Sequence, residues 1–197
     1  MNYQIKQASE IIRKIKGSKF IARVCVVESR EMAQAIVANV ESGHRKASHV
    51  CWACRIDQDG ESLGYSSDAG EPHGSAGPPI LAAIEGRELT NVLCLVIRYF
   101  GGTKLGIGGL IRAYGGVASE ALELAGKKRH KQITTVTIQC DPDNYSDIMR
   151  VLRKYRLSVQ PEFTPDSVSV QIEIPAKDLN NLSREIGVIP SATIISG

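Results

Sequence analysis

The chain has 197 residues, of which 43% are hydrophobic and 23% are charged, so a globular fold with packed cores is expected. Its net charge of +3 is too small to classify the whole chain as a nucleic-acid-binding protein, and no apolar run approaches the roughly 18 residues that a membrane span needs. The five cysteines are an odd number without any sign of secretion, which favours reduced thiols in a cytoplasmic protein with no membrane partner.

The first predicted elements are a strand and a helix. β-branched and apolar residues predict a strand over residues 18–27. Ser29 is suited to cap the helix that follows, and Gly43 is suited to end it. On the apolar face expected for this helix, Met32, Ile36 and Val40 recur at four-residue spacing, with Ala33 and Val37 beside them.

A hairpin, a loop and a short helix are expected next. The mostly apolar residues 49–56 predict a second strand, and residues 61–66 are expected to return beside it. Residues 67–79 contain so many glycines and prolines that they predict a loop. A short helix is expected over residues 80–84, ended by Gly86.

The following segment joins a buried strand to a long helix. Residues 91–99 are nearly all apolar, which predicts a strand that is buried on both faces. Residues 100–109 form a glycine-rich stretch. From Leu110 the apolar residues follow helical spacing as far as Ala125, and Gly126 is a natural residue to end that helix.

Residues 127–131 are a run of basic residues that separates two differently patterned parts of the chain. The part before residue 131 carries 17 basic and 13 acidic side chains, whereas the part from residue 131 onward carries 7 basic and 8 acidic side chains. We therefore predict two domains, residues 1–126 and 131–197, with the excess of positive charge in the first.

The second domain is expected to have the order βαββαβ, which is that of a ferredoxin-like fold. Its strands are predicted over residues 132–140, 157–163, 167–174 and 193–195. Asp143 is suited to cap the first helix, whose apolar face would be Ile148, Val151, Leu152 and Tyr155. The second helix is marked by Leu179, Leu182 and Ile186. The fold class predicted for the whole chain is therefore α+β, in two domains.

Two stretches of the first domain resemble the signature segments of the IMPACT/YigZ family. They are SSDAGEPHGSAGPPIL, residues 66–81, and VIRYFGGTKLGIGGLIRAYG, residues 96–115. Residues 17–22 and 49–53 are similar to the same family, in the same order along the chain. The second domain is similar to the small C-terminal domain of bacterial YigZ-like members, which resembles domain V of elongation factor G.

The resemblance implies a first domain like the second domain of the fifth small-subunit ribosomal protein, a βαβ sandwich with helices on one face. It also implies a connection with translational control, because family members are linked to that process. Three positions depart from the family pattern: Ala69 stands at the place of a common second Asp, His73 at that of a small polar residue, and Pro78 at that of a basic residue. The missing carboxylate weakens any paired-acid or two-metal site in this loop.

The glycine-rich stretch is a candidate anion site. Free backbone N–H groups at a helix N-terminus attract anions, and glycines let a phosphate approach the backbone closely. The P-loop pattern is absent from the sequence, and tight packing of the helix against the sheet is the alternative explanation of the glycines. Tyr99, Phe100 and Tyr114 flank the stretch and could stack on bases, although we expect at least one in the core. The predicted anion-binding or nucleic-acid-binding residues are Arg98, Gly101, Gly102, Lys104, Gly108, Gly109 and Arg112.

His49, Asp68 and Glu71 are candidate catalytic residues. If the loop folds over the strand, His49 would meet one of the two carboxylates, and a His–carboxylate pair can transfer a proton or simply pin the loop. Cys51 and Cys54 have the sequence spacing of a metal or redox pair. On a strand, however, this spacing places the two thiols on opposite faces, so the sequence predicts neither a metal site nor a cofactor.

Three functions are compatible with these observations. The favoured one is a translation-associated regulatory protein that binds RNA, the ribosome or a translation factor through the basic glycine-rich surface. The second is an enzyme that acts on a small phosphorylated or peptide substrate near His49, Asp68 and Glu71. The third is a protein–protein regulator without an anion site. A pocket that joins His49 to Glu71 would favour the enzyme, and an open basic face would favour the RNA-binding protein.

Overall fold

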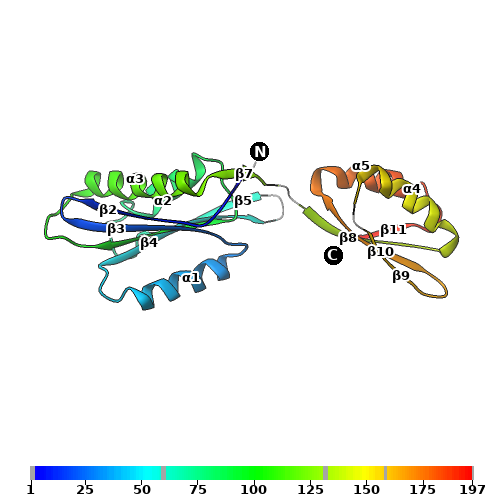
Figure 1. Ribbon diagram of the computed structural model, residues 1–197, viewed down its shortest axis with the longest axis horizontal. Helices are drawn as coiled ribbons and strands as arrows, with labels where there is room; N and C mark the ends of the chain where they lie inside the picture. Colours follow the sequence, from blue (N-terminus) through cyan, green and yellow to red (C-terminus); the bar gives the residue numbers. More distant parts are fainter. Residues whose placement is uncertain (1–2, 59–60, 131–132, 158, 197) are drawn as a thin grey trace. The chain divides into compact units, whose positions relative to one another are not determined.

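The computed structural model describes residues 3–58, 61–130, 133–157 and 159–196, and the chain divides into two compact units, Met1–His130 and Lys131–Gly197 (Figure 1). Each unit contains helices packed on an antiparallel sheet, which confirms the predicted α+β class. Among the described residues, no helix combines the length and the apolar character that crossing a bilayer would require. The two units are called the N-terminal and the C-terminal unit below.

A five-stranded antiparallel sheet forms the centre of the N-terminal unit. The predicted strands are confirmed, and the sheet contains one strand more, ahead of the first of them. Across the sheet the order is β2 (Ser9–Ile15), β3 (Ser18–Val26), β6 (Val92–Tyr99), β4 (His49–Gln58) and β5 (Glu61–Ser67). The central strand β6 is buried along almost its whole length, so both faces of the sheet must be covered.

Helices cover both faces of this sheet (Figure 1). The helices α2 (Gly77–Glu85) and α3 (Ile107–Ala125) pack on one face, and α1 (Arg30–Gly43) packs on the other. The implied arrangement with helices on one face is therefore wrong for α1. The reason is that β6 and β4 expose apolar side chains on both sides, so that a second layer has to exclude water from the face opposite α3.

The helix α1 begins where the sequence predicts and buries only part of the apolar set that the sequence indicates. The Ser29 hydroxyl oxygen accepts a hydrogen bond of 3.1 Å from the backbone N–H of Met32, which confirms the predicted cap. The buried residues of the helix are Ala33, Val37 and Val40, whereas Met32 is exposed. The small side chain of Ala33 allows the helix to approach the sheet more closely than Met32 would, so volume as well as spacing decides which stripe is buried.

Three strands were not predicted, and two of them form a small sheet of their own. Strand β1 (Tyr3–Ile5) pairs antiparallel with β7 (Lys127–Arg129), and the third is β2. β7 lies within the basic run, so residues 127–129 of this run form a paired strand; Lys131 lies outside the described residues. β1, β2 and β7 are rich in charged or polar residues because they lie at sheet edges, where one side of the strand meets solvent.

The C-terminal unit is a four-stranded antiparallel sheet covered by two helices on one face. The strand order β11-β8-β10-β9 and the chain order βαββαβ confirm the predicted ferredoxin-like fold. Asp143 does not cap a helix as predicted; it lies in a short 3-10 turn, Pro142–Asn144, and the helix begins after it. The elements are β8 (Ile133–Cys140), α4 (Tyr145–Tyr155), β9 (Val159–Phe163), β10 (Val168–Pro175), α5 (Ala176–Ile186) and β11 (Thr193–Ser196).

A contact between two glycines joins the β2–β3 turn to the end of β6. Gly17 has a φ of +83°, and a Cβ added to it would lie 2.8 Å from the carbonyl oxygen of Gly101. A Cβ added to Gly101 would collide with the carbonyl group of Gly17. The backbone N–H of Gly101 also donates to the Ser18 hydroxyl, at 3.2 Å. Only glycine permits two backbones to pack this closely, so this contact positions the loop that follows β6.

We predict that Gly101→Ala lowers the free energy of unfolding by roughly 1–3 kcal/mol, because the added methyl group forces the two backbones apart. Gly116→Ala is the matched control: Gly116 is inside α3 with open space around it, so alanine should raise the free energy of unfolding by about 0.5–1 kcal/mol. Urea unfolding followed by the fluorescence of the single tryptophan, Trp52, measures both. Equal stabilities for Gly101→Ala and the wild type would contradict the role assigned to this contact.

Candidate functional site

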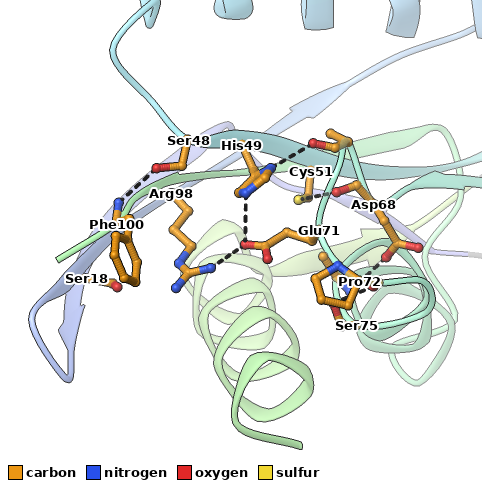
Figure 2. Close-up of polar contacts among 12 residues, drawn as sticks. Ser18, Ser48, His49, Cys51, Asp68, Glu71, Pro72, Ser75, Arg98 and Phe100 are labelled. Carbon is orange, nitrogen blue, oxygen red and sulfur yellow. Dashed lines mark hydrogen bonds and ion pairs between the residues drawn. The ribbon is translucent and has the colours of Figure 1, made fainter. Parts of the chain in front are cut away.

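Polar side chains from two strands, a helix and a loop meet at one end of the N-terminal sheet (Figure 2). His49 on β4 and Arg98 on β6 are directly opposite each other in the sheet register. The loop between β5 and α2 passes over them and directs Glu71 toward both, as Figure 2 shows. Tyr114 of α3 reaches the same carboxylate from the helix layer.

Glu71 and Arg98 form a buried ion pair. The Arg98 Nη1 donates to Glu71 Oε1 at 2.6 Å, and the Tyr114 hydroxyl donates to the same oxygen at 2.7 Å. Only 3% of the Glu71 side chain and 6% of the Arg98 side chain are exposed. Burial raises the pKa of the Tyr114 hydroxyl, so it keeps its proton and remains a donor. The carboxylate charge is thus neutralised by one cation and further stabilised by a hydroxyl.

Arg98 is enclosed between two aromatic rings instead of facing solvent as predicted. Its guanidinium carbon lies 5.7 Å from the ring centre of Phe20 and 5.4 Å from that of Phe100. Its Nε has no hydrogen-bond partner within the part of the chain that the structure describes. Arg98 therefore belongs with Glu71, although the sequence predicts the two residues in separate sites, and it is not on an open anion-binding surface.

His49 holds the loop by one ring nitrogen and faces Glu71 with the other. Its Nδ1 lies 2.9 Å from the carbonyl oxygen of Ala69, so this nitrogen carries a proton and donates it. Its Nε2 lies 3.9 Å from Glu71 Oε1, which is too long for a hydrogen bond. Ala69 adopts a left-handed conformation, with a φ of +46°, that residues other than glycine seldom adopt. His49 and Glu71 are thus brought together, as the enzyme hypothesis requires, but without direct hydrogen bonding.

Asp68, the third candidate catalytic residue, organises the loop and the start of α2. Its carboxylate accepts hydrogen bonds of 2.8–2.9 Å from the backbone N–H groups of Gly74, Ala76 and Gly77. Partial burial by itself would raise the pKa of Asp68, but these three donors together with nearby His73 outweigh it and lower the pKa below its ordinary value. Asp68 therefore supplies the cap that the N-cap residue of α2, Ala76, cannot provide with its own side chain.

The two cysteines of β4 lie on opposite faces of the sheet, as predicted. Cys51 belongs to the core under α2 and α3, and Cys54 belongs to the core under α1. Burial raises the pKa of the Cys51 thiol to about 12 and that of Cys54 to about 11, so both are protonated at neutral pH. The Cys51 Sγ donates to the carbonyl oxygen of Asp68 at 3.0 Å, which gives it a structural partner.

The remaining predicted anion-binding residues lie in the exposed loop and at the start of α3. Gly101, Gly102 and Lys104 are exposed in the loop. The helix begins at Ile107, inside the glycine-rich stretch and earlier than predicted, and no side chain caps it. Gly108 lies in its first turn, and a Cβ there would be 3.6 Å from Nη1 of Arg112, whose side chain therefore lies over the helix start. Gly109 has a packing role, since a Cβ there would be 3.0 Å from the Leu105 Cβ.

Four further cations, which the sequence did not single out, lie at this end of the sheet. The Gly17–Gly101 contact brings the β2–β3 turn to the loop, and the backbone N–H of Phe100 donates to the Ser48 hydroxyl at 3.1 Å, which brings the segment before β4 there as well. A signal was present in the sequence, because residues 11–27, 42–56 and 89–118 contain no Asp or Glu. We call the resulting surface the basic end, formed by Lys16, Lys19, Arg45, Lys46, Lys104 and Arg112.

Because the ion pair is buried, we predict that removing one of its members lowers the free energy of unfolding strongly. Arg98→Met leaves the Glu71 carboxylate buried without its counter-ion, so we expect it to lower the free energy of unfolding by roughly 3–5 kcal/mol. Adding Glu71→Gln should recover part of this loss. The exposed pair of Arg13 and Glu120 is the control, and its coupling energy should be below about 1 kcal/mol. Urea unfolding of both double-mutant cycles tests this; additive effects of Arg98→Met and Glu71→Gln would contradict it.

The lowered pKa of Asp68 predicts a pH dependence. A carboxylate with a depressed folded-state pKa stabilises the fold above its ordinary value, 3.8, and this stabilisation is lost as the pH falls through the folded-state value. Asp68→Asn should therefore be about 0.5–2 kcal/mol less stable than the wild type at pH 7, with the difference narrowing below about pH 4. Asp166→Asn, which changes an exposed carboxylate, should show neither effect. A pH-independent difference for Asp68→Asn would disprove this assignment.

Comparison with known proteins places the chain in a family. Residues 16–122 match the Impact N-terminal domain. An IMPACT family member of Haemophilus influenzae is 33% identical over 183 residues, which cover 92% of this chain and 88% of that protein, and the IMPACT family member YigZ of Escherichia coli is 32% identical over 89% of this chain and 87% of its own length. The crystal structure of a hypothetical protein matches with a TM-score of 0.71 at 28% identity, over 99% of this chain and 96% of that one. The chain therefore belongs to the IMPACT family.

Proposed function

We propose that this protein is a translation-associated regulator that acts by binding and not by catalysis, and that its basic end binds RNA, free or in the ribosome. Family membership connects the chain with translational control, and the basic end supplies the chemistry that an RNA partner requires. A translation factor is the other candidate partner in the same process. It would be favoured only if the basic end proves indifferent to RNA.

The observation that carries this proposal is the separation of charge within the N-terminal unit. Six cations lie exposed or half-exposed at the basic end, and the segments that bear them contain no carboxylate. Such a surface has a positive potential that attracts polyanions and accelerates their association. The uncapped start of α3 adds unpaired backbone N–H groups to the same surface.

The buried cluster fits an enzyme less well. The carboxylate of Glu71 is occupied by Arg98 and Tyr114, and that of Asp68 by three backbone N–H groups. The Cys51 thiol is protonated at neutral pH. His49 has its Nδ1 engaged by the loop, and a quarter of its side chain is exposed. These groups are used to hold the loop on the sheet, which supports a structural role for them.

If the basic end binds RNA, removing any one of its positive charges should weaken the affinity for RNA. Lys104→Ala and Arg112→Ala should each weaken the binding of RNA to a similar degree for all sequences, and each should lower the salt slope of the affinity by about one unit, because each removes one phosphate contact. Lys177→Ala, which removes an exposed cation from the C-terminal unit, is the matched control and should change neither quantity. Fluorescence anisotropy with labelled RNA at several salt concentrations measures all three.

The same titrations decide between the proposed partners. Absence of RNA binding at low salt would reject RNA as the partner and favour a translation factor or another protein. Binding that Lys104→Ala and Arg112→Ala leave unchanged would place the RNA elsewhere on the protein and would reject the basic end.

A further inference from the structure

Phe100 differs from the two other aromatic residues near the glycine-rich loop. Tyr114 is fully buried in the core, and the Tyr99 hydroxyl is 2.8 Å from Nδ1 of His44. Phe100, in contrast, is 49% exposed. It lies between the buried Arg98 and the glycines of the exposed loop, in the middle of the basic end.

The backbone around Phe100 is held firmly on both sides. Its own N–H donates to Ser48, and the next N–H, that of Gly101, donates to Ser18. The glycine contact with Gly17 then prevents the chain from shifting toward the β2–β3 turn. An exposed aromatic ring on such a restrained backbone loses little conformational entropy when a ligand binds to it.

The ring itself is supported from inside. The Arg98 guanidinium lies on one side of it, and the ion pair with Glu71 fixes that guanidinium in turn (Figure 2). The exposed part of the ring is therefore left for a partner. A flat, exposed aromatic ring surrounded by cations is the combination with which proteins bind single-stranded nucleic acid, since each base offers a flat face and each phosphate a charge.

We infer that Phe100 is a stacking platform for one unpaired base, so that the basic end selects single-stranded RNA over duplex RNA. The inference rests on the proposed RNA-binding function and specifies its ligand. In a duplex each base is stacked between its neighbours and paired, so its flat face is not accessible to a side chain. The cations of the basic end would contact phosphates of either form, and only the base stacked on Phe100 would distinguish them.

The first test measures the affinity of the full chain for two RNAs of about 12 nucleotides, a single-stranded oligo(U) and a duplex. Phe100→Ala should weaken the binding of oligo(U) about tenfold and leave the affinity for the duplex and both salt slopes unchanged, because it removes a stacked base and no phosphate contact. Phe163→Ala, which removes another exposed ring, in the C-terminal unit, is the control and should have no effect.

A second test reports the stacking directly and does not depend on the affinity. Trp52 is the only tryptophan, so Trp52→Phe combined with Phe100→Trp places the only indole at the platform. Titration with oligo(U) should then quench the tryptophan emission, whereas titration with duplex RNA should leave it unchanged. The Phe100→Trp variant should also bind oligo(U) at least as tightly as the wild type, because a larger ring stacks at least as well.

The outcomes separate this inference from the function on which it rests. If the wild type binds RNA in a manner that depends on Lys104, but Phe100→Ala binds oligo(U) normally and the introduced indole is not quenched, the stacking platform is rejected and the proposed function stands. If the wild type binds no RNA at low salt, both are rejected. If Phe100→Ala weakens the binding of single-stranded and duplex RNA equally, Phe100 only maintains the structure of the basic end. In that case the proposed selection of single-stranded RNA is rejected.

Discussion

The ion pair between Glu71 and Arg98, together with the hydroxyl of Tyr114, joins a strand, a loop and a helix of the N-terminal unit. Arg98 comes from the central strand β6 and Glu71 from the loop ahead of α2, and both side chains are almost fully buried. Removing two charges from water is costly, and the cost is compensated only when the pair has good geometry and additional hydrogen bonds. The hydroxyl of Tyr114 provides one of these bonds and ties α3 to the same carboxylate.

The arrangement of the loop depends on this pair and on two further anchors. His49 holds the carbonyl group of Ala69, and Asp68 collects three N–H donors from the residues that lead into α2. Each interaction connects a side chain with backbone groups that would otherwise be left unsatisfied near the core. The polar cluster of Figure 2 is consequently a scaffold in which each charged group already has a partner.

The basic end has the opposite character, since its cations face solvent and no carboxylate lies in the segments that carry them. The two regions meet at Arg98 and Phe100. The buried cation supports the inner side of the ring, and the outer side belongs to the exposed surface. An unpaired charge costs little free energy in water and much in the core. The buried charges of Glu71 and Arg98 are therefore paired, whereas the exposed cations of the basic end can remain unpaired.

The sequence by itself determined the α+β class, most strands of both units, the cap of α1 at Ser29 and the opposite orientations of Cys51 and Cys54. These properties follow from local periodicity and capping, which depend only on neighbouring residues. Edge strands such as β2 escaped prediction because charged residues are tolerated where a strand meets solvent. Only the tertiary structure decided that Arg98 is buried against Glu71 and that Lys16, Lys46 and Lys104 share one surface. The physical reason is that a side chain's partner and its exposure are set by which segments the sheet register brings together, and that register is not local information.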